Sequence, residues 1–404
     1  PTYSAQLDAK LLANAHAVGD VDGDDCTEFL FGSTAGEVII FKVSSDTLVR
    51  WKRCVVDGAV SAICLDQLSS DSDTRIFVFT REGSCVVFHF SESGDEFRPA
   101  AEFRVPLNTC AAAVLQGNLV LGADDGTVSV WNPAPNALGG FRLGSKHELF
   151  GEIKEFAVTP SLGDTNGLLR IQCTHAVFTL TFESDADNAD RPAAPLIKRV
   201  EYPSDIKNVA LQAYTAIGQP IAHANTSGNV CVTSSTEDSK WSTQISDALV
   251  SLEAITIGGI AQVDAVLVCT WSGHVHAYLD PHNCVRFRTF LPLATTFIAE
   301  VNFTDEVEPE QVLVAISTSG VLLIYRDLRS VLGHAMNTST DVNHASVVNT
   351  KINTEKKRKA ILDRLKSLPA ATDIAALSRK KTSLQEMQHL LAHWPGDASS
   401  PPST

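Results

Sequence analysis

The chain has 404 residues, of which 44% are hydrophobic and 20% charged, and its formal net charge is −15. This hydrophobic content is ample for an extensive core, whereas the acidic excess argues against a nucleic-acid groove or a general surface for anionic membranes. No run approaches the roughly eighteen consecutive apolar residues of a membrane-spanning helix, so we expect no direct membrane insertion. Residues 1–8 lack the basic and apolar regions of a signal peptide, which predicts a cytoplasmic protein.

The first element is an aspartate-rich stretch within residues 17–41, AVGDVDGDDCTEFLFGSTAGEVIIF. Acidic side chains occupy positions 1, 3, 5 and 9 of a calcium-loop spacing: Asp20, Asp22, Asp24 and Glu28. Position 6, where such loops usually have glycine, is Asp25, and no other part of the chain repeats the motif. We therefore prefer a tight turn in which aspartates accept hydrogen bonds from backbone amides, with weak calcium affinity at most.

A strand, a small-residue turn and a second strand then recur along the chain. The copies are separated by 47, 43, 49, 53, 45 and 47 residues, measured between turns at Gly36, Gly83, Gly126, His175, Gly228, Gly273 and Gly320. A period in the forties built from short strands is typical of a β-propeller with one four-stranded sheet per blade. Seven copies predict an all-β fold, a seven-bladed propeller over residues 1–328.

The turns and the chain ends support this prediction. Glycine permits the positive φ of a tight hairpin, and the strands are apolar on both faces because each blade packs between two others. We expect the ring to close with a strand near YSAQLDAK, residues 3–10, that pairs with the last blade and so removes a free sheet edge.

Residues with potential chemistry are few. The nine cysteines contain no CxxC pair and mostly lie in apolar runs, as reduced core cysteines do. His274 and His276 can share one strand face, but no third metal ligand is near them in sequence. No GxSxG, P-loop or HExxH motif occurs. We predict no catalytic residues, no cofactor and no enzyme.

The C-terminal part has a different composition. A polar linker is expected at 329–350, a basic helical extension at 351–394 and a disordered tail at 395–404. The extension carries a net charge of +6 against −21 for the remainder, and its apolar stripe can dock on the propeller or bind a partner. The candidate partner-binding residues are Met387, Leu391 and Trp394.

Two stretches resemble a known family. VGDVDGDDCTEFLFG, residues 18–32, is similar to the FG-GAP pattern of integrin-α-like propellers. Residues 247–325, with a C-x-W-x-G turn and a following VRF, resemble the integrin-alpha FG-GAP repeat-containing protein 2 family. The resemblance implies a subunit of KICSTOR, a cytosolic assembly peripheral to the lysosomal membrane that recruits the GATOR complex and restrains the TOR kinase. The partners it implies are kaptin-like propeller proteins and the large KICSTOR scaffold subunit.

We therefore expect a non-catalytic scaffold that binds other proteins in amino-acid-dependent growth signalling. One alternative is a generic WD40-like adaptor in another pathway, because DDGTVSVW, residues 124–131, fits the sequence pattern of WD40 repeats. The other is a propeller enzyme or a calcium-dependent lectin.

Overall fold

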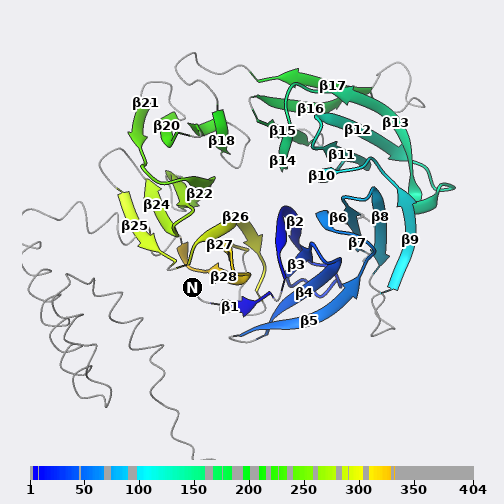
Figure 1. The fold of residues 1–404 in the computed structure, drawn as a ribbon, viewed down its shortest axis with the longest axis horizontal. Helices are drawn as coiled ribbons and strands as arrows, with labels where there is room; N and C mark the ends of the chain where they lie inside the picture. The colour runs from blue at the N-terminus through cyan, green and yellow to red at the C-terminus, as the bar shows by residue number, and fades with distance from the viewer. Residues whose placement is uncertain are drawn as a thin grey trace, which may run out of the picture. The chain divides into compact units, whose positions relative to one another are not determined.

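The chain forms a seven-bladed β-propeller of antiparallel four-stranded sheets (Figure 1). The structure is a computed structural model. It describes residues 3–332 except 8, 45–46, 68–73, 90–97, 160–166, 175, 184–193, 201–208, 215–219, 226, 234–239, 258–262, 279–283, 290, 304–308 and 329–331. The predicted fold class is confirmed.

Blades 1 to 4 follow one another in chain order, each from its inner to its outer strand. Blade 1 comprises β2 (Leu11–Gly19), β3 (Glu28–Ser33), β4 (Glu37–Ser44) and β5 (Thr47–Val55). Blade 2 comprises β6 (Val60–Gln67), β7 (Thr74–Thr80), β8 (Ser84–His89) and β9 (Arg98–Arg104). Blade 3 comprises β10 (Thr109–Leu115), β11 (Asn118–Ala123), β12 (Thr127–Pro133) and β13 (Phe141–Glu148), with a short 3-10 helix at Leu138–Gly140. Blade 4 comprises β14 (Ile153–Thr159), β15 (Leu168–Cys173), β16 (Val177–Glu183) and β17 (Ala194–Arg199).

Blades 5 to 7 complete the ring. Blade 5 comprises β18 (Val209–Tyr214), β19 (Pro220–Asn225), β20 (Asn229–Thr233) and β21 (Lys240–Gln244). Blade 6 comprises β22 (Leu249–Ile257), β23 (Val263–Thr270), β24 (His274–Tyr278) and β25 (Cys284–Arg288). Blade 7 takes β26 (Leu293–Val301), β27 (Glu310–Ser317) and β28 (Val321–Tyr325), and its outer strand is β1 (Tyr3–Gln6).

The first and last strands of the propeller pair with each other, as expected from the sequence. β1 is antiparallel to β28, with Tyr3 opposite Ile324 and Gln6 opposite Val321. Beyond the strand, the Leu7 amide donates to the Gly320 carbonyl at 2.7 Å. The predicted closure by residues near the amino terminus is therefore confirmed.

The core lies between the blades, where both faces of the central strands are covered. Every residue of β3 and of β11 is buried, which explains why these strands lack polar alternation in sequence. Aromatic side chains fill much of the space between blades, among them Phe29, Phe31, Phe41, Phe77, Phe79 and Phe88. None of the nine cysteines, all of which the structure describes, forms a disulfide. Among the described residues, no helix has the length and apolarity to cross a membrane.

The repeated glycines allow close approach of the backbone. Gly36 has a φ of 83°, and a Cβ at this position would lie 2.3 Å from the Val56 carbonyl oxygen. Gly228, Gly273 and Gly320 show the same conformation and the same crowding by a carbonyl. The turns thus require glycine both for φ and for space.

Strand direction gives the propeller two distinct faces. Because the strands of each blade alternate in direction, the turn between its second and third strands shares a face with the connection to the next blade. We call this the glycine-turn face, since it carries the turns at Gly36, Gly83 and Gly126. The loop at residues 20–27, which joins β2 to β3, lies on the opposite face.

The predicted C-terminal elements lie outside the described residues. These are the linker 329–350 apart from Leu332, the basic extension 351–394 with Met387, Leu391 and Trp394, and the tail 395–404. All of these stay predictions.

Candidate functional site

The aspartate loop between β2 and β3 is ordered first by its own backbone. Asp20 accepts hydrogen bonds from the Gly23 amide at 2.7 Å on Oδ1 and from the Asp25 amide at 3.0 Å on Oδ2. Gly23 and Asp25 have φ values of 75° and 62°. Asp25 thus adopts the left-handed conformation that glycine usually supplies at position 6, and Asp20 stabilises the turn that results.

A lysine from β4 reaches into this loop and contacts two of its carboxylates and that of Glu28, the first residue of β3. Nζ of Lys42 lies 2.6 Å from Oδ2 of Asp22, 2.7 Å from Oδ2 of Asp24 and 3.2 Å from Oε1 of Glu28. The ammonium also lies 4.3 Å from the ring centre of Trp51 on β5. Three carboxylates and an aromatic face therefore surround one cation.

Neighbouring blades hold the loop as well. The Thr74 hydroxyl of blade 2 donates to the Asp20 carbonyl at 2.9 Å. On the other side, the Thr27 amide donates to the Asn302 carbonyl of blade 7 at 3.1 Å, and the Asn302 amide donates to the Thr27 hydroxyl at 2.9 Å. The loop therefore links three blades.

These residues do not fit a calcium ion while Lys42 is in place. Calcium requires about six oxygens at roughly 2.3–2.6 Å, and Oδ1 and Oδ2 of Asp20 already accept backbone amides. The Lys42 ammonium stands among the oxygens of Asp22, Asp24 and Glu28, where the ion would have to bind. The weak calcium affinity expected from the sequence stays a prediction. Sequence reasoning missed Lys42 because it lies outside the local spacing that defines such loops.

Glu28 is the buried acid of the cluster. Its side chain has no exposed surface, and Oε2 accepts the Val21 amide at 2.8 Å. Desolvation raises its pKa to about 7, since the contacts with Val21 and Lys42, which favour the ionised form, offset only part of that cost.

This pKa predicts a pH dependence of stability. The pKa of Glu28 is higher in the folded than in the unfolded chain. The protonated side chain therefore contributes fully to the free energy of unfolding below about pH 4.5, and this contribution is lost as the pH rises to about 7. Between pH 5 and 7.5, the wild type should lose about 2–3 kcal/mol more unfolding free energy than Glu28→Gln. Urea unfolding of both proteins at several pH values measures this, and parallel curves would contradict the assignment.

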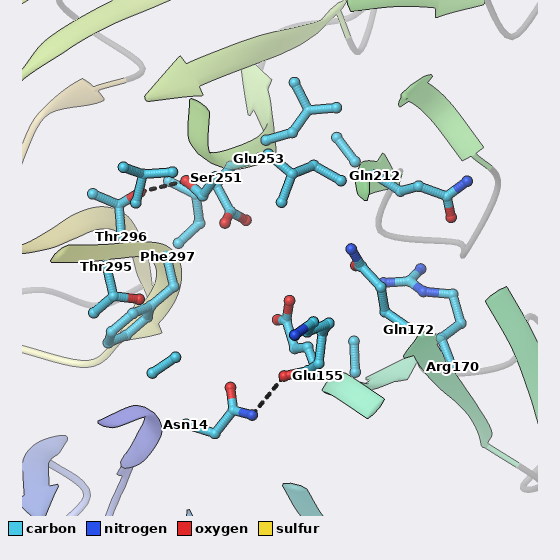
Figure 2. A pocket seen from close by; sticks show the side chains of 18 of the residues that line it. Asn14, Glu155, Arg170, Gln172, Gln212, Ser251, Glu253, Thr295, Thr296 and Phe297 are labelled. Atoms are coloured by element: carbon cyan, nitrogen blue, oxygen red, sulfur yellow. Dashed lines mark hydrogen bonds between the residues drawn. The ribbon is translucent and has the colours of Figure 1, made fainter. Parts of the chain in front are cut away.

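The central channel contains a cavity of about 330 Å³, lined by inner strands of five blades (Figure 2). Figure 2 shows the carboxylates of Glu155 and Glu253 directed into the same space, with Arg170 and Gln172 nearby. Asn14 donates to the Lys154 carbonyl at 2.7 Å. Desolvation raises the pKa of Glu155 and that of Glu253, and repulsion by Glu155 raises the latter further. Arg170 partly opposes this rise at both glutamates, so the cavity is polar, with acidic and basic side chains in its lining, and burial favours the protonated carboxyls.

A hydroxyl, an imidazole and a carboxylate meet on blade 6 in an order unlike that of a hydrolase. Oγ of Ser272 contacts Oδ2 of Asp247 and lies 2.8 Å from Nδ1 of His274. In a catalytic triad the carboxylate binds the histidine, which then activates the hydroxyl. Here the carboxylate binds the hydroxyl itself, so this group does not match nucleophilic catalysis. His276, which the sequence paired with His274, stacks on Tyr278.

The glycine-turn face exposes large apolar side chains on two adjacent connections between blades. Leu107, between β9 and β10, is 68% exposed, and Phe150, between β13 and β14, is 73% exposed. The turn containing the exposed Asp125 lies between them. The Asp124 amide donates to the Asn108 carbonyl at 3.2 Å, and the Leu149 amide donates to the Gly126 carbonyl at 2.9 Å. We call Leu107, Asp125 and Phe150 the apolar-acidic patch. Sequence reasoning did not identify it.

Two proteins named KICSTOR complex protein ITFG2 are similar to this chain. The Mus musculus protein is 25% identical over 331 residues, which cover 69% of this chain and 73% of the mouse protein. The Bos taurus protein is 21% identical over 335 residues, which cover 70% of this chain and 62% of the bovine protein. The chain thus spans less than two thirds of the bovine relative. No family model matches the chain.

Two solved structures share the fold. The crystal structure of BBS1N in complex with ARL6DN, soaked with lead, has a TM-score of 0.54 and 15% identity, covering 80% of this chain and 94% of that one. The structure of Saccharomyces cerevisiae Sqt1 has a TM-score of 0.50 and 9% identity, covering 80% and 98%. These likenesses concern the fold alone. The two sequence relatives support the family that the first and last blades resemble: the chain is a distant relative of the proteins named KICSTOR complex protein ITFG2.

Proposed function

We propose that the chain is a non-catalytic propeller scaffold, a KICSTOR-type subunit that holds protein partners together. The names of its relatives and its propeller fold support this proposal. In this function it binds a kaptin-like propeller and the large KICSTOR scaffold subunit, and through them helps recruit GATOR to the lysosomal surface. It would thereby act in the cytoplasm as a negative regulator of amino-acid-dependent TOR signalling.

The observation that carries the scaffold function is the apolar-acidic patch. Exposed aromatic and aliphatic side chains on a rigid face are the residue types that anchor protein interfaces. Leu107 and Phe150 sit on connections whose backbones are hydrogen-bonded to neighbouring turns, so a partner would meet a preformed surface. With Asp125 between them, the patch suits a partner segment with apolar side chains flanked by lysine or arginine.

Binding to purified partners tests this proposal. Phe150→Ala combined with Leu107→Ser should weaken binding of the full chain to the kaptin-like subunit or the large scaffold subunit by about tenfold or more. Both side chains are exposed, so the melting temperature should change little. Asp125→Lys should weaken the same interaction, with the loss largest at low salt.

Trp271→Ala is the matched control, because Trp271 is 53% exposed on the glycine-turn face but belongs to blade 6. Equal loss of binding in the control would show that the patch has no special role. If the wild type binds neither partner, the KICSTOR-type assignment is wrong.

A further inference from the structure

The aspartate loop contains a cation supplied by the chain itself. An ammonium has three N–H donors; that of Lys42 donates hydrogen bonds to Asp22 and Asp24 and forms an ion pair with Glu28. One carboxylate oxygen from each of Asp20, Asp22 and Glu28 lies within 4.8 Å of the other two, close enough to surround a single ion. The lysine thus stands where a loop of this spacing would hold a metal.

We propose that Lys42 is a built-in replacement for a metal ion, which keeps the loop at residues 20–27 ordered against the start of β3 without calcium. Removing the lysine side chain should convert the loop into a site for a hard divalent cation with oxygen ligands.

Two buried oxygens show that the cluster has acceptor capacity beyond what the lysine uses. Oδ1 of Asp22 and Oε1 of Glu28 are buried and accept no hydrogen bond within the described part of the chain. Glu28 is fully buried, and its Oε1 faces the ammonium at 3.2 Å. A monovalent ammonium therefore leaves polar oxygens incompletely satisfied, whereas a divalent cation could bind them directly.

The surroundings of Lys42 favour a permanent rather than an exchangeable cation. Its stem is anchored on β4, next to β5, and its ammonium lies over Trp51, so little conformational freedom is lost when it binds the carboxylates. A tethered cation does not depend on free calcium. The link from the loop to Thr74 and Asn302 then stabilises the contacts among blades 1, 2 and 7 at any calcium concentration.

Thermal unfolding of the purified full chain with calcium tests the proposal. The wild-type melting temperature should change by less than about 1 °C up to roughly 10 mM calcium chloride, compared with sodium chloride of equal ionic strength. Lys42→Ala should be less stable than the wild type in chelator and should regain several degrees as calcium is added. Adding Asp22→Asn to this variant should abolish the gain.

Lys52→Ala is the matched control, since Lys52 also lies near the Trp51 ring, 5.4 Å from its centre, whereas the ion pairs with Asp22, Asp24 and Glu28 are made by Lys42. It should show no calcium response. Should Lys42→Ala not fold in chelator, refolding of it and of Lys42→Ser in calcium is the measurement, and recovery supports the proposal. A calcium response in the wild type as large as in Lys42→Ala would overturn it. So would a Lys42→Ala protein that ignores calcium, or failure of both variants to fold with calcium.

Discussion

Removing residues 1–7 should abolish most of the propeller's stability, although those residues form one short strand. The deletion takes away β1 and Leu7 and leaves the edge of β28 unpaired. Tyr3 and Leu7 are 4% and 1% exposed and pack in one cluster with residues of blades 1 and 7. The Tyr3 hydroxyl also accepts a hydrogen bond from Arg326 at 3.1 Å.

The size of this effect follows from the burial. Truncating a single buried leucine costs about 2–5 kcal/mol, and a domain is stable by only about 5–15 kcal/mol. The deletion removes two such side chains and four residues of sheet pairing. We expect loss of cooperative unfolding or insolubility, because the exposed edge can template association.

The deletion has an internal control and a rescue. Removal of residues 1–2 alone, which precede β1, should leave the melting temperature unchanged. A synthetic peptide of residues 3–10 added to the truncated protein should raise its melting temperature by supplying the strand in trans. A truncated protein with wild-type thermal stability would contradict the closure by β1.

The second large effect concerns a turn glycine. Gly36→Ala should lower the free energy of unfolding by about 3 kcal/mol or more, since the left-handed conformation costs about 1–2 kcal/mol and the new methyl meets backbone. The methyl would lie 2.3 Å from the Val56 oxygen and 2.9 Å from the Gly58 oxygen. The Val56 amide donates to Gly36, so neither segment can move freely.

Gly117→Ala separates the two causes. Gly117 has a φ of 73°, similar to that of Gly36, but the atom nearest to a methyl group added there would be Cγ of Pro133, at 3.9 Å. This variant should lose only about 1 kcal/mol, the cost of the conformation alone. Chemical denaturation of both proteins measures the difference. Equal losses would show that crowding by the Val56 carbonyl is not what requires glycine at position 36.

Much of the architecture can be predicted from the sequence because it is repeated. A strand–glycine–strand unit appears in most copies, and each copy meets the same local demand for a positive φ, as at Gly126. The fourth copy lacks the glycine, yet β15 and β16 still pair there, because packing against blade 3 buries Leu169 and Ile171 and stabilises the sheet. Closure was also predictable, since a free sheet edge in the last blade requires a partner.

The chemistry of the sites could not be predicted in the same way, because it depends on residues far apart in sequence. Glu155 and Glu253 affect each other only because the ring brings β14 and β22 to one channel. Lys42 meets the aspartate loop only through the pairing of β3 with β4.

The exposure of the apolar-acidic patch could not be predicted from the sequence for a different reason. Phe150 directly follows Leu149, whose amide donates to the carbonyl of the turn glycine Gly126. In two other connections between blades, the residue that follows the equivalent amide donor is Asp57 or Ser246. Other connections have Pro106 and Phe290 at the same position, so aligning the repeats on this backbone contact would not have distinguished Phe150 as an exposed residue. In a single pass along the sequence, it resembles core.

The pairing of β1 with β28 also has a consequence for synthesis. Tyr3 leaves the ribosome long before its partner Ile324 exists. At about 5–20 residues per second, the delay is roughly 15–60 s, during which the first strand has no sheet to join. Blades 1 to 6 can form meanwhile, but the ring can shut only after the seventh is made. A nascent chain of this design therefore exposes an unfinished sheet for tens of seconds, so we expect its yield in cells to depend on chaperones that shield such edges, and on translation speed near codon 320.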